Sequence, residues 1–315
     1  MTINFLQVSL KKNIPIIKKN YLSLKKFYPQ IKIKIICSKS EQKVFKNEFK
    51  NHNIQIINEN SILKLSLFKK HFLNSFYDKN FKKEISKKIG WYYQQALKLV
   101  FIFIFFNKKN SRKLVLWEAD TLILNKIQFF KNNCGVNFGT FFEKNQHYFT
   151  TILNLLKELP NNYLSGTCQF TAITYKDVNS LRRRLNIFQK KKEKINIWFS
   201  KIMGKSISGS HNIYSASLFS EQDLLTINKI LNKETKQEPV LYFRNYNINA
   251  LFTNFQISIL KFLNFDHLTL DSYNKMKKNK INYIIFFLRL LKIILLYNFR
   301  KTKYLVSYYK NKINT

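Results

Sequence analysis

Two carboxylates two positions apart, Glu118 and Asp120, directly follow an apolar run of the sequence. The run, residues 113–117, has the length and composition of a buried strand. Carboxylates at a strand end can both turn toward one divalent cation, such as Mn²⁺ or Mg²⁺, which prefers oxygen ligands and completes its shell with substrate phosphates. The spacing therefore predicts a metal site suited to a nucleoside diphosphate group. The alternative is a solvated turn in which Asp120 caps a helix.

A long, mostly apolar segment precedes this strand. Residues 91–106 are predicted to form a buried helix, because their uninterrupted apolar part, 99–106, is much shorter than the roughly 20 residues that span a bilayer. The helix begins with the sequence Gly-Trp-Tyr-Tyr-Gln-Gln and carries Lys98 one turn later. Its polar start is expected either to face a ligand or to lie against solvent.

Together, the two segments resemble the bacterial polysaccharide-type glycosyltransferases of GT-A fold. Among these enzymes, the chain looks like an uncharacterised family that pairs a W-x-x-Q-Q-x-x-K-L helix with a D-A-D-T strand end and a later Ser-Glu helix start. Here the Asp of Glu-Ala-Asp-Thr follows the Trp of the helix by 29 residues. Glu118 stands where the family has the first Asp of its D-x-D motif, and its extra methylene makes Asp120 the safer metal ligand.

The resemblance implies a sugar transferase that uses a nucleotide-sugar donor and a metal held by Asp120 and Glu118. It also implies that four residues of the helix face the donor or support the metal loop: Trp91, Gln94, Gln95 and Lys98. For Trp91 the alternative is a place in the core, since it lies in an apolar run.

A second pair of carboxylates opens a later helix. Ser220 is predicted to cap a helix that runs to about residue 231, with Glu221 and Asp223 in its first turn. By resemblance, this helix lies on the acceptor side, where Glu221, with Asp223 as the second candidate, would take the proton of an acceptor hydroxyl. The alternative is a cap whose acids only complement the helix dipole, which is worth about 1 kcal/mol.

Other residues with suitable chemistry lack a supporting pattern. His211 and His267 are candidates for a third metal ligand, but a single loop histidine is more often polar surface. The arginines 182–184 could contact a diphosphate, although on a helix they point in different directions and would more often be a solvated face.

The elements that must position these residues alternate along the chain. Residues 14–27 show a helical stripe, 31–37 and 54–57 read as strands, and 5–9 as a possible first strand. This order predicts an α/β layer with parallel strands. The resemblance implies more: a GT-A-like α/β fold over about residues 1–270, with a mixed, mainly parallel sheet and helices on both faces. In such sheets ligands bind at the carboxyl ends of the strands, where Glu118 is expected.

Less regular elements are expected further along the chain. Residues 153–159 are predicted to form a short helix and 170–173 a strand, followed by a helix capped by Asp177.

Composition narrows the class of protein. The 315 residues are 45% hydrophobic with six Gly and four Pro, which excludes a disordered or collagenous chain. Three widely spaced cysteines indicate neither a disulfide framework nor a zinc site, and no signal peptide pattern opens the chain, so a cytoplasmic protein is expected. The net charge of +38 comes almost entirely from lysine, whereas nucleic-acid readers favour arginine; nucleic acid is therefore not the expected partner.

The last part of the chain, residues 271–315, is expected to form a basic, amphipathic helical tail. Residues 281–299 are apolar except for four positions, and lysines flank both ends. Such a helix suits the surface of an anionic membrane, which would place the protein at the inner membrane face. The alternative is a helix packed on the preceding domain.

The resemblance implies a hexosyltransferase-like function: transfer of a sugar from a nucleotide-diphosphate-sugar to a hydroxyl of a cell-surface glycan or lipid-linked acceptor. A non-catalytic membrane- or polyanion-binding protein with a degenerate transferase fold is the alternative. A nucleotidyl or phosphoryl transferase using the same metal site is a third reading.

Overall fold

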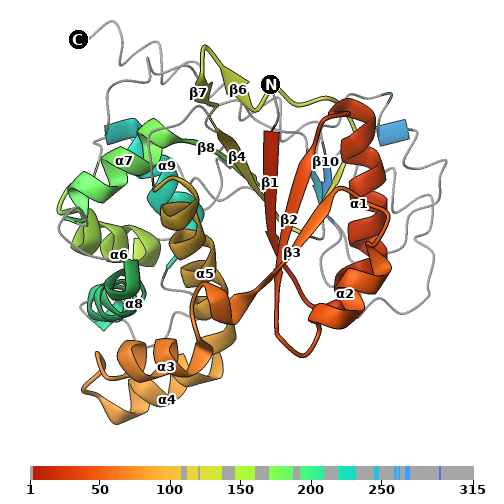
Figure 1. The fold of residues 1–315 in the computed structure, drawn as a ribbon. Coiled ribbons are helices and arrows are strands. Elements are labelled where there is room, and N and C mark those ends of the chain that lie inside the picture. Colours follow the sequence, from red (N-terminus) through yellow and green to blue (C-terminus); the bar gives the residue numbers. More distant parts are fainter. Residues whose placement is uncertain are drawn as a thin grey trace, which may run out of the picture.

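A five-stranded sheet organises the protein, in the strand order β3-β2-β1-β4-β8. The first four strands are parallel and β8 pairs with β4 in the antiparallel direction (Figure 1). The strands are β1 (Ile3–Val8), β2 (Lys32–Cys37), β3 (Ile54–Asn58), β4 (Lys113–Trp117) and β8 (Phe170–Thr174). The expected α/β class with a mixed, mainly parallel sheet is confirmed.

The computed structural model describes most of the first 231 residues. The described ranges are 3–107, 112–119, 121–136, 146–159, 170–186, 192–208 and 219–231, with the short pieces 245–247, 259–260, 262, 267–269 and 291.

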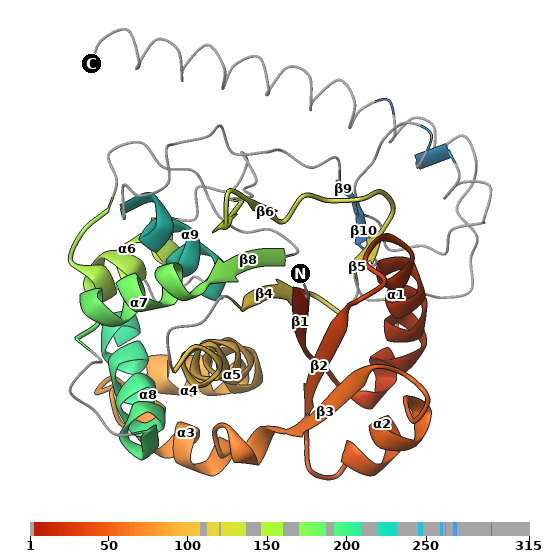
Figure 2. The same cartoon turned by 45° about the horizontal axis from the view of Figure 1, so that its top comes forward.

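Alternating side chains of the strands point to opposite faces of the sheet, and each face is covered by helices. Phe5, Val115 and Trp117 contribute to one hydrophobic cluster, together with helices α1 (Ile14–Phe27) and α2 (Gln42–Glu48). Leu6, Leu114 and Leu116 contribute to a second cluster on the other face. Figure 2 shows α1 and α2 on one side of the strands and α5 on the other.

The second cluster is built around α5 (Ile89–Phe105), whose residues 95–103 are all buried. The helices that surround α5 on this face are α3 (Leu65–Leu73), α4 (Lys79–Lys87), α6 (Gln146–Leu156), α7 (Tyr175–Arg184), α8 (Lys192–Ser208) and α9 (Glu221–Leu231). The helix expected at 91–106 is thus confirmed as a buried helix. Among the described residues, no helix is both long and apolar enough to cross a membrane.

Two predicted helix starts need correction. The helix expected at 153–159 begins earlier, at Gln146, and ends at Leu156, because Lys157 takes a left-handed backbone conformation with φ of 62°. Asp177 does not cap α7. The cap is Thr174, and Asp177 lies three residues later, where its carboxylate accepts a hydrogen bond from the Thr174 backbone N–H at 2.8 Å.

The remaining short strands form two sheets separate from the main one. A three-stranded sheet joins β5 (Thr121–Ile123), β10 (His267–Thr269) and β9 (Asn245–Asn247), and a hairpin joins β6 (Phe130–Lys131) to β7 (Cys134–Gly135). A Cβ atom at Gly135 would lie 2.4 Å from the carbonyl oxygen of Ala172, so only glycine lets the hairpin approach β8 this closely. Apart from Leu291, the predicted tail 271–315 lies outside the described residues.

Candidate active site

Lys98 joins two carboxylates from distant parts of the chain. It lies near the middle of α5, and its ammonium donates a hydrogen bond to Glu118, the residue that directly follows β4. The same ammonium lies 2.7 Å from Oε1 of Glu221, the first residue of α9. The three segments that the sequence analysis singled out therefore meet at one ammonium group, at the carboxyl end of β4.

Two further hydrogen bonds hold α9 against this cluster. The side-chain oxygen of Gln95 accepts from the backbone N–H of Glu221 at 3.2 Å, which satisfies one of the donors left unpaired at a helix start. The side-chain amide of Gln222 donates to Glu118 at 3.4 Å. Ser220 caps α9 as expected, because its hydroxyl accepts from the backbone N–H of Asp223 at 3.2 Å.

Solvent reaches the members of the cluster unequally. The side chain of Glu118 is 26% exposed, whereas those of Lys98 and Glu221 are 4% and 2% exposed. Glu118 is therefore the member that a ligand in solution can touch. Lys98 and Glu221 lie beneath it, where charges must be paired to be tolerated.

The cluster also changes the acidity of its members. Burial by itself lowers the pKa of Lys98, but the charges of Glu118 and Glu221 and their hydrogen bonds raise it above its ordinary value of 10.5. Burial raises the pKa of Glu221, and the nearby negative charge of Glu118 adds to this, although Lys98 acts in the opposite direction. Lys98 is thus held in its charged form.

The other predicted site residues lie outside this cluster or outside the described residues. Trp91 packs against the hydrophobic cluster around α5, as the core alternative expected, and Gln94 is half-buried on α5 one turn before Lys98. Asp223 is fully buried in the first turn of α9. Asp120 and His211 lie outside the described residues, and for His267 only the backbone, in β10, is described.

The described residues contain no group of three or more His, Cys, Asp or Glu side chains that could hold a metal ion. Glu118 nevertheless has the chemistry of a metal ligand. A carboxylate has two oxygens, so one can accept from Lys98 while the other reaches a cation, and the exposed fraction of Glu118 leaves an edge toward solvent.

The arginine run of α7 has a structural use. Arg182 is buried, and its guanidinium donates to the carbonyl oxygens of Phe103 at 2.5 Å and Phe106 at 2.8 Å. These carbonyls belong to the C-terminal turn of α5, where helices leave acceptors unsatisfied. The sequence suggested a phosphate ligand or a solvated face. Arg182 is neither, because its guanidinium ties α7 to the end of α5.

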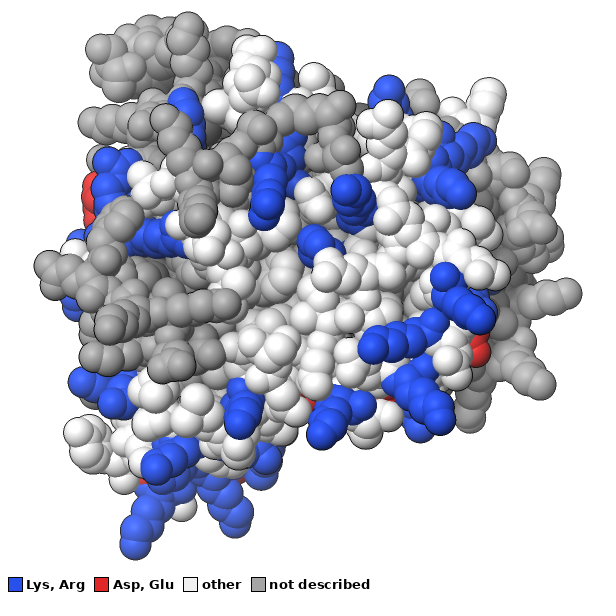
Figure 3. Space-filling model, viewed as in Figure 1, with Lys and Arg blue, Asp and Glu red and all other residues white. Residues whose placement is uncertain are grey.

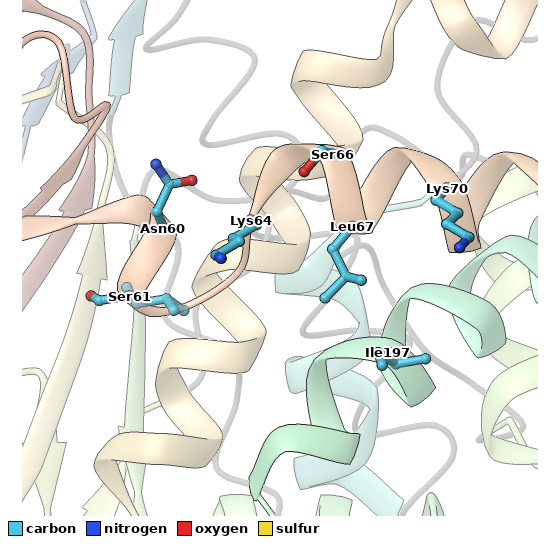
Figure 4. A pocket seen from close by; sticks show the side chains of 8 residues that line it. Asn60, Ser61, Lys64, Ser66, Leu67, Lys70 and Ile197 are labelled. Carbon is cyan, nitrogen blue, oxygen red and sulfur yellow. The ribbon is translucent and has the colours of Figure 1, made fainter.

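A separate pocket of about 730 Å³ lies between the start of α3 and α8 (Figure 4). Five of its eight lining residues are polar or cationic, Asn60, Ser61, Lys64, Ser66 and Lys70, and the others are Ile62, Leu67 and Ile197. It follows the carboxyl end of β3, the neighbour of β2 in the sheet, and the sequence analysis did not identify it.

Gln222 is the one residue of the cluster that the sequence analysis passed over. Its position between two predicted acids in the first turn of α9 was no usable signal, because successive residues of a helix point in different directions and only the packing of α9 turns Gln222 toward Glu118.

Comparison with known proteins gives likenesses of overall structure only. No family model and no curated protein matches the chain. Among solved structures, the chain is similar to the galactosyltransferase LgtC in complex with donor and acceptor sugar analogues, with a TM-score of 0.41 and 11% identity, covering 89% of this chain and 84% of that one.

Two other solved structures give the same picture. An active-site mutant of LgtC gives a TM-score of 0.40 at 13% identity, with the same coverage of both chains. The PaToxG glycosyltransferase gives 0.31 at 12% identity, covering 67% of this chain and 69% of that one. TM-scores and identities this low assign neither a family nor an activity, so the chemistry of the site has to carry the functional assignment.

Proposed function

We propose that this protein is a glycosyltransferase that moves a sugar from a nucleotide-diphosphate-sugar to a hydroxyl of a glycan or lipid-linked acceptor. The observation that carries the proposal is the contact of Lys98 with both Glu118 and Glu221. The helix motif, the strand-end carboxylate and the Ser-Glu helix start that resemble GT-A enzymes are far apart in sequence, yet they form one cluster. It lies at the edge of the sheet where α/β proteins bind ligands.

In this proposal, Glu118 is the residue that faces the ligand. Transfer of a sugar requires the acceptor hydroxyl to attack the anomeric carbon while the nucleoside diphosphate leaves with growing negative charge. Glu118 would hold the donor side of the site through its exposed edge, and Lys98 fixes the direction of its carboxylate from below. Gln222 adds a second donor to the same carboxylate.

A divalent cation, Mn²⁺ or Mg²⁺, would be held by Asp120 together with Glu118. When bound, it supplies positive charge that stabilises the leaving diphosphate. Lys98 does not supply this positive charge in the proposal, because its ammonium is buried beneath Glu118.

The contacts of Glu221 favour positioning over proton transfer. A general base must come within about 2.6–3.2 Å of the hydroxyl that it deprotonates. Glu221 is 2% exposed and already paired with Lys98, so we propose that it orients the Lys98–Glu118 pair. Its role as the acceptor base stays the alternative.

The experiment that tests the function is hydrolysis of a panel of nucleotide-sugars by the purified full chain, with and without Mn²⁺. Release of nucleoside diphosphate from one donor, dependent on Mn²⁺, supports the proposal. Stabilisation by a nucleotide-sugar in a thermal shift assay, with no turnover on any acceptor, would instead favour the degenerate, non-catalytic alternative. Release of pyrophosphate from a nucleoside triphosphate would indicate the nucleotidyl transferase.

The pH dependence of the reaction distinguishes a positioning role of Glu221 from proton transfer. If Glu221 positions the Lys98–Glu118 pair, Glu221→Gln lowers kcat without shifting the pH profile, because a different group titrates in the reaction. Loss of the acidic limb of that profile would instead identify Glu221 as the base. Glu84→Gln, at an exposed ion pair of α4, is the matched control.

A further inference from the structure

The end of the molecule formed by α3 and α4 is basic, although residues 11–34 around α1, with eight lysines and no acid, are more so. Residues 64–88, here named the α3–α4 face, hold eight lysines and two acids, a net charge of +6 in 25 residues, against +38 for all 315. This is about twice the average density of charge. The lysines are Lys64, Lys69, Lys70, Lys79, Lys82, Lys83, Lys87 and Lys88.

The two acids of this face are engaged within it. Asp78 caps α4, where its carboxylate accepts from the backbone N–H of Phe81 at 2.7 Å, and Glu84 pairs with Lys87 at 2.6 Å. Figure 3 shows Lys and Arg side chains gathered where α3 and α4 lie, at the lower left of the view. The face therefore presents cations to solvent.

A large aromatic side chain stands among these cations. Tyr77, in the connection between α3 and α4, is 97% exposed, while its neighbour Phe76 is buried in the hydrophobic cluster. Tyrosine combines an apolar ring with a hydroxyl, and it is enriched where proteins meet the headgroup layer of a bilayer. An exposed tyrosine beside lysines thus matches both components of a lipid surface.

We infer that the α3–α4 face docks on an anionic lipid bilayer, with its lysines against the headgroups and Tyr77 inserted between them. The pocket described above lies beside this face, because Lys64 and Lys70 of the face are among its lining residues.

A bilayer is favoured over a nucleic acid by the kind of cation. Residues 64–88 contain no arginine, the residue whose planar fork grips phosphate and guanine at two points. Lysine acts as a point charge, which suffices for attraction to a negative lipid surface.

The α3–α4 face and Glu118 lie at the same end of the sheet. Strand β3 leads through the turn η2 (Glu59–Ser61) into α3, so the face lies at the end of the molecule where the parallel strands finish (Figure 1). Glu118 follows β4 at the same end of the sheet. The inference does not depend on the proposed function, since it requires only the surface.

Vesicle sedimentation of the full chain tests the inference, with phosphatidylcholine vesicles that contain or lack phosphatidylglycerol. The test variant is Lys79→Glu with Lys83→Glu, two exposed residues one turn apart on α4. The matched control is Lys12→Glu with Lys19→Glu, two exposed lysines, one in the turn Lys11–Asn13 just before α1 and one within α1, on the opposite face of the sheet. Both change the net charge equally. We expect the α4 variant to reduce partitioning to the anionic vesicles about ten-fold or more, and the α1 variant by far less.

Tyr77→Ser provides an independent measurement. Salt screens the lysines over a Debye length of about 8 Å but leaves burial of the ring unaffected, so this variant should lose the binding that remains at high salt. Circular dichroism melts of all variants verify that the fold is retained.

Three outcomes overturn the inference. Equal losses from the α1 and α4 variants would show that overall charge controls binding, and unchanged binding of the α4 variant would place the contact elsewhere. Retention of a single-stranded RNA in a gel shift, lost only in the α4 variant and without vesicle binding, would make the face a nucleic-acid site.

Discussion

The ammonium of Lys98 lies 2.7 Å from the carboxylate of Glu221, although 123 residues separate the two in the chain. Both side chains are almost fully buried, and Glu118 shares the same ammonium. Burying a charge is tolerated only when it is paired, so each member of this group depends on the others. This dependence makes the cluster testable without a substrate.

Lys98→Met should lower the free energy of unfolding by about 3–5 kcal/mol, because it leaves two carboxylates close together without their cation. Urea denaturation measures the loss. The exposed pair of Lys87 and Glu84 gives the control, and Lys87→Met there should cost at most about 1 kcal/mol.

The double variant Lys98→Met with Glu221→Gln completes the cycle. It should be more stable than Lys98→Met alone, with a coupling energy of about 1–3 kcal/mol. If the two substitutions simply add, the contact between Lys98 and Glu221 contributes nothing to the folded state, and the cluster has been misread.

Alkaline pH should weaken the protein through the same lysine. The pKa of Lys98 is raised in the folded state above its ordinary 10.5, so its contribution to stability is complete below the unfolded pKa and is lost as the pH rises through the folded value. The melting temperature of wild type minus that of the double variant should therefore stay constant from about pH 7 to pH 10 and fall above about pH 10.5. A difference that already falls between pH 7 and pH 9 would contradict a raised pKa.

Asp120→Asn should abolish Mn²⁺-dependent turnover, because it removes the negative charge that a hard cation requires. Titration of the protein with Mn²⁺, followed by electron paramagnetic resonance, should show weaker binding independently of activity. Glu118→Gln should have a milder effect on Mn²⁺ affinity, since Lys98 already takes part of its charge. Wild-type turnover and Mn²⁺ binding in the Asp120 variant would exclude the metal site.

Arg182→Ala should destabilise the fold by about 1.5–3 kcal/mol, because two buried carbonyl oxygens at the end of α5 lose a charged donor. Its neighbour Arg183 is exposed, so Arg183→Ala should change stability by less than about 0.5 kcal/mol. Thermal melts compare the two. Equal effects would mean that the charge of the run matters and the two hydrogen bonds do not.

The strands and the central helix could be predicted because their patterns are local. The strand at 113–117 has the predicted bounds and the first helix, 14–27, likewise, since an apolar run and a helical stripe are visible in the sequence. Helices α3, α4 and α8 were passed over. The signal for α4 was present, because Asp78 is a typical capping residue and here accepts from Phe81.

The candidate site was predictable only in its parts. Residue types marked Glu118, Lys98 and Glu221 as candidates, but their meeting depends on how α9 packs on α5, which no local pattern encodes. For the same reason Arg182 was misinterpreted, whereas Arg183 is exposed as expected. Arg182 looks like a surface cation in sequence, and only the packing of α7 against the end of α5 gives its guanidinium buried acceptors.

The order of strands in the sheet has a consequence for synthesis on the ribosome. β4 pairs on one side with β1, which is made early, and on the other with β8, which is made later, and Glu221 emerges later still. The emerging chain can therefore form the sheet β3-β2-β1-β4 with α5 packed on one face while one edge of β4 is still unpaired. At this stage Lys98 has only Glu118 as a counter-charge. An open strand edge invites pairing with other chains. At about 5–20 residues per second, the roughly 55 residues from the end of β4 to the end of β8 leave this edge open for about 3–11 s, and the roughly 100 residues from Glu118 to Glu221 leave Lys98 without its second counter-charge for about 5–20 s.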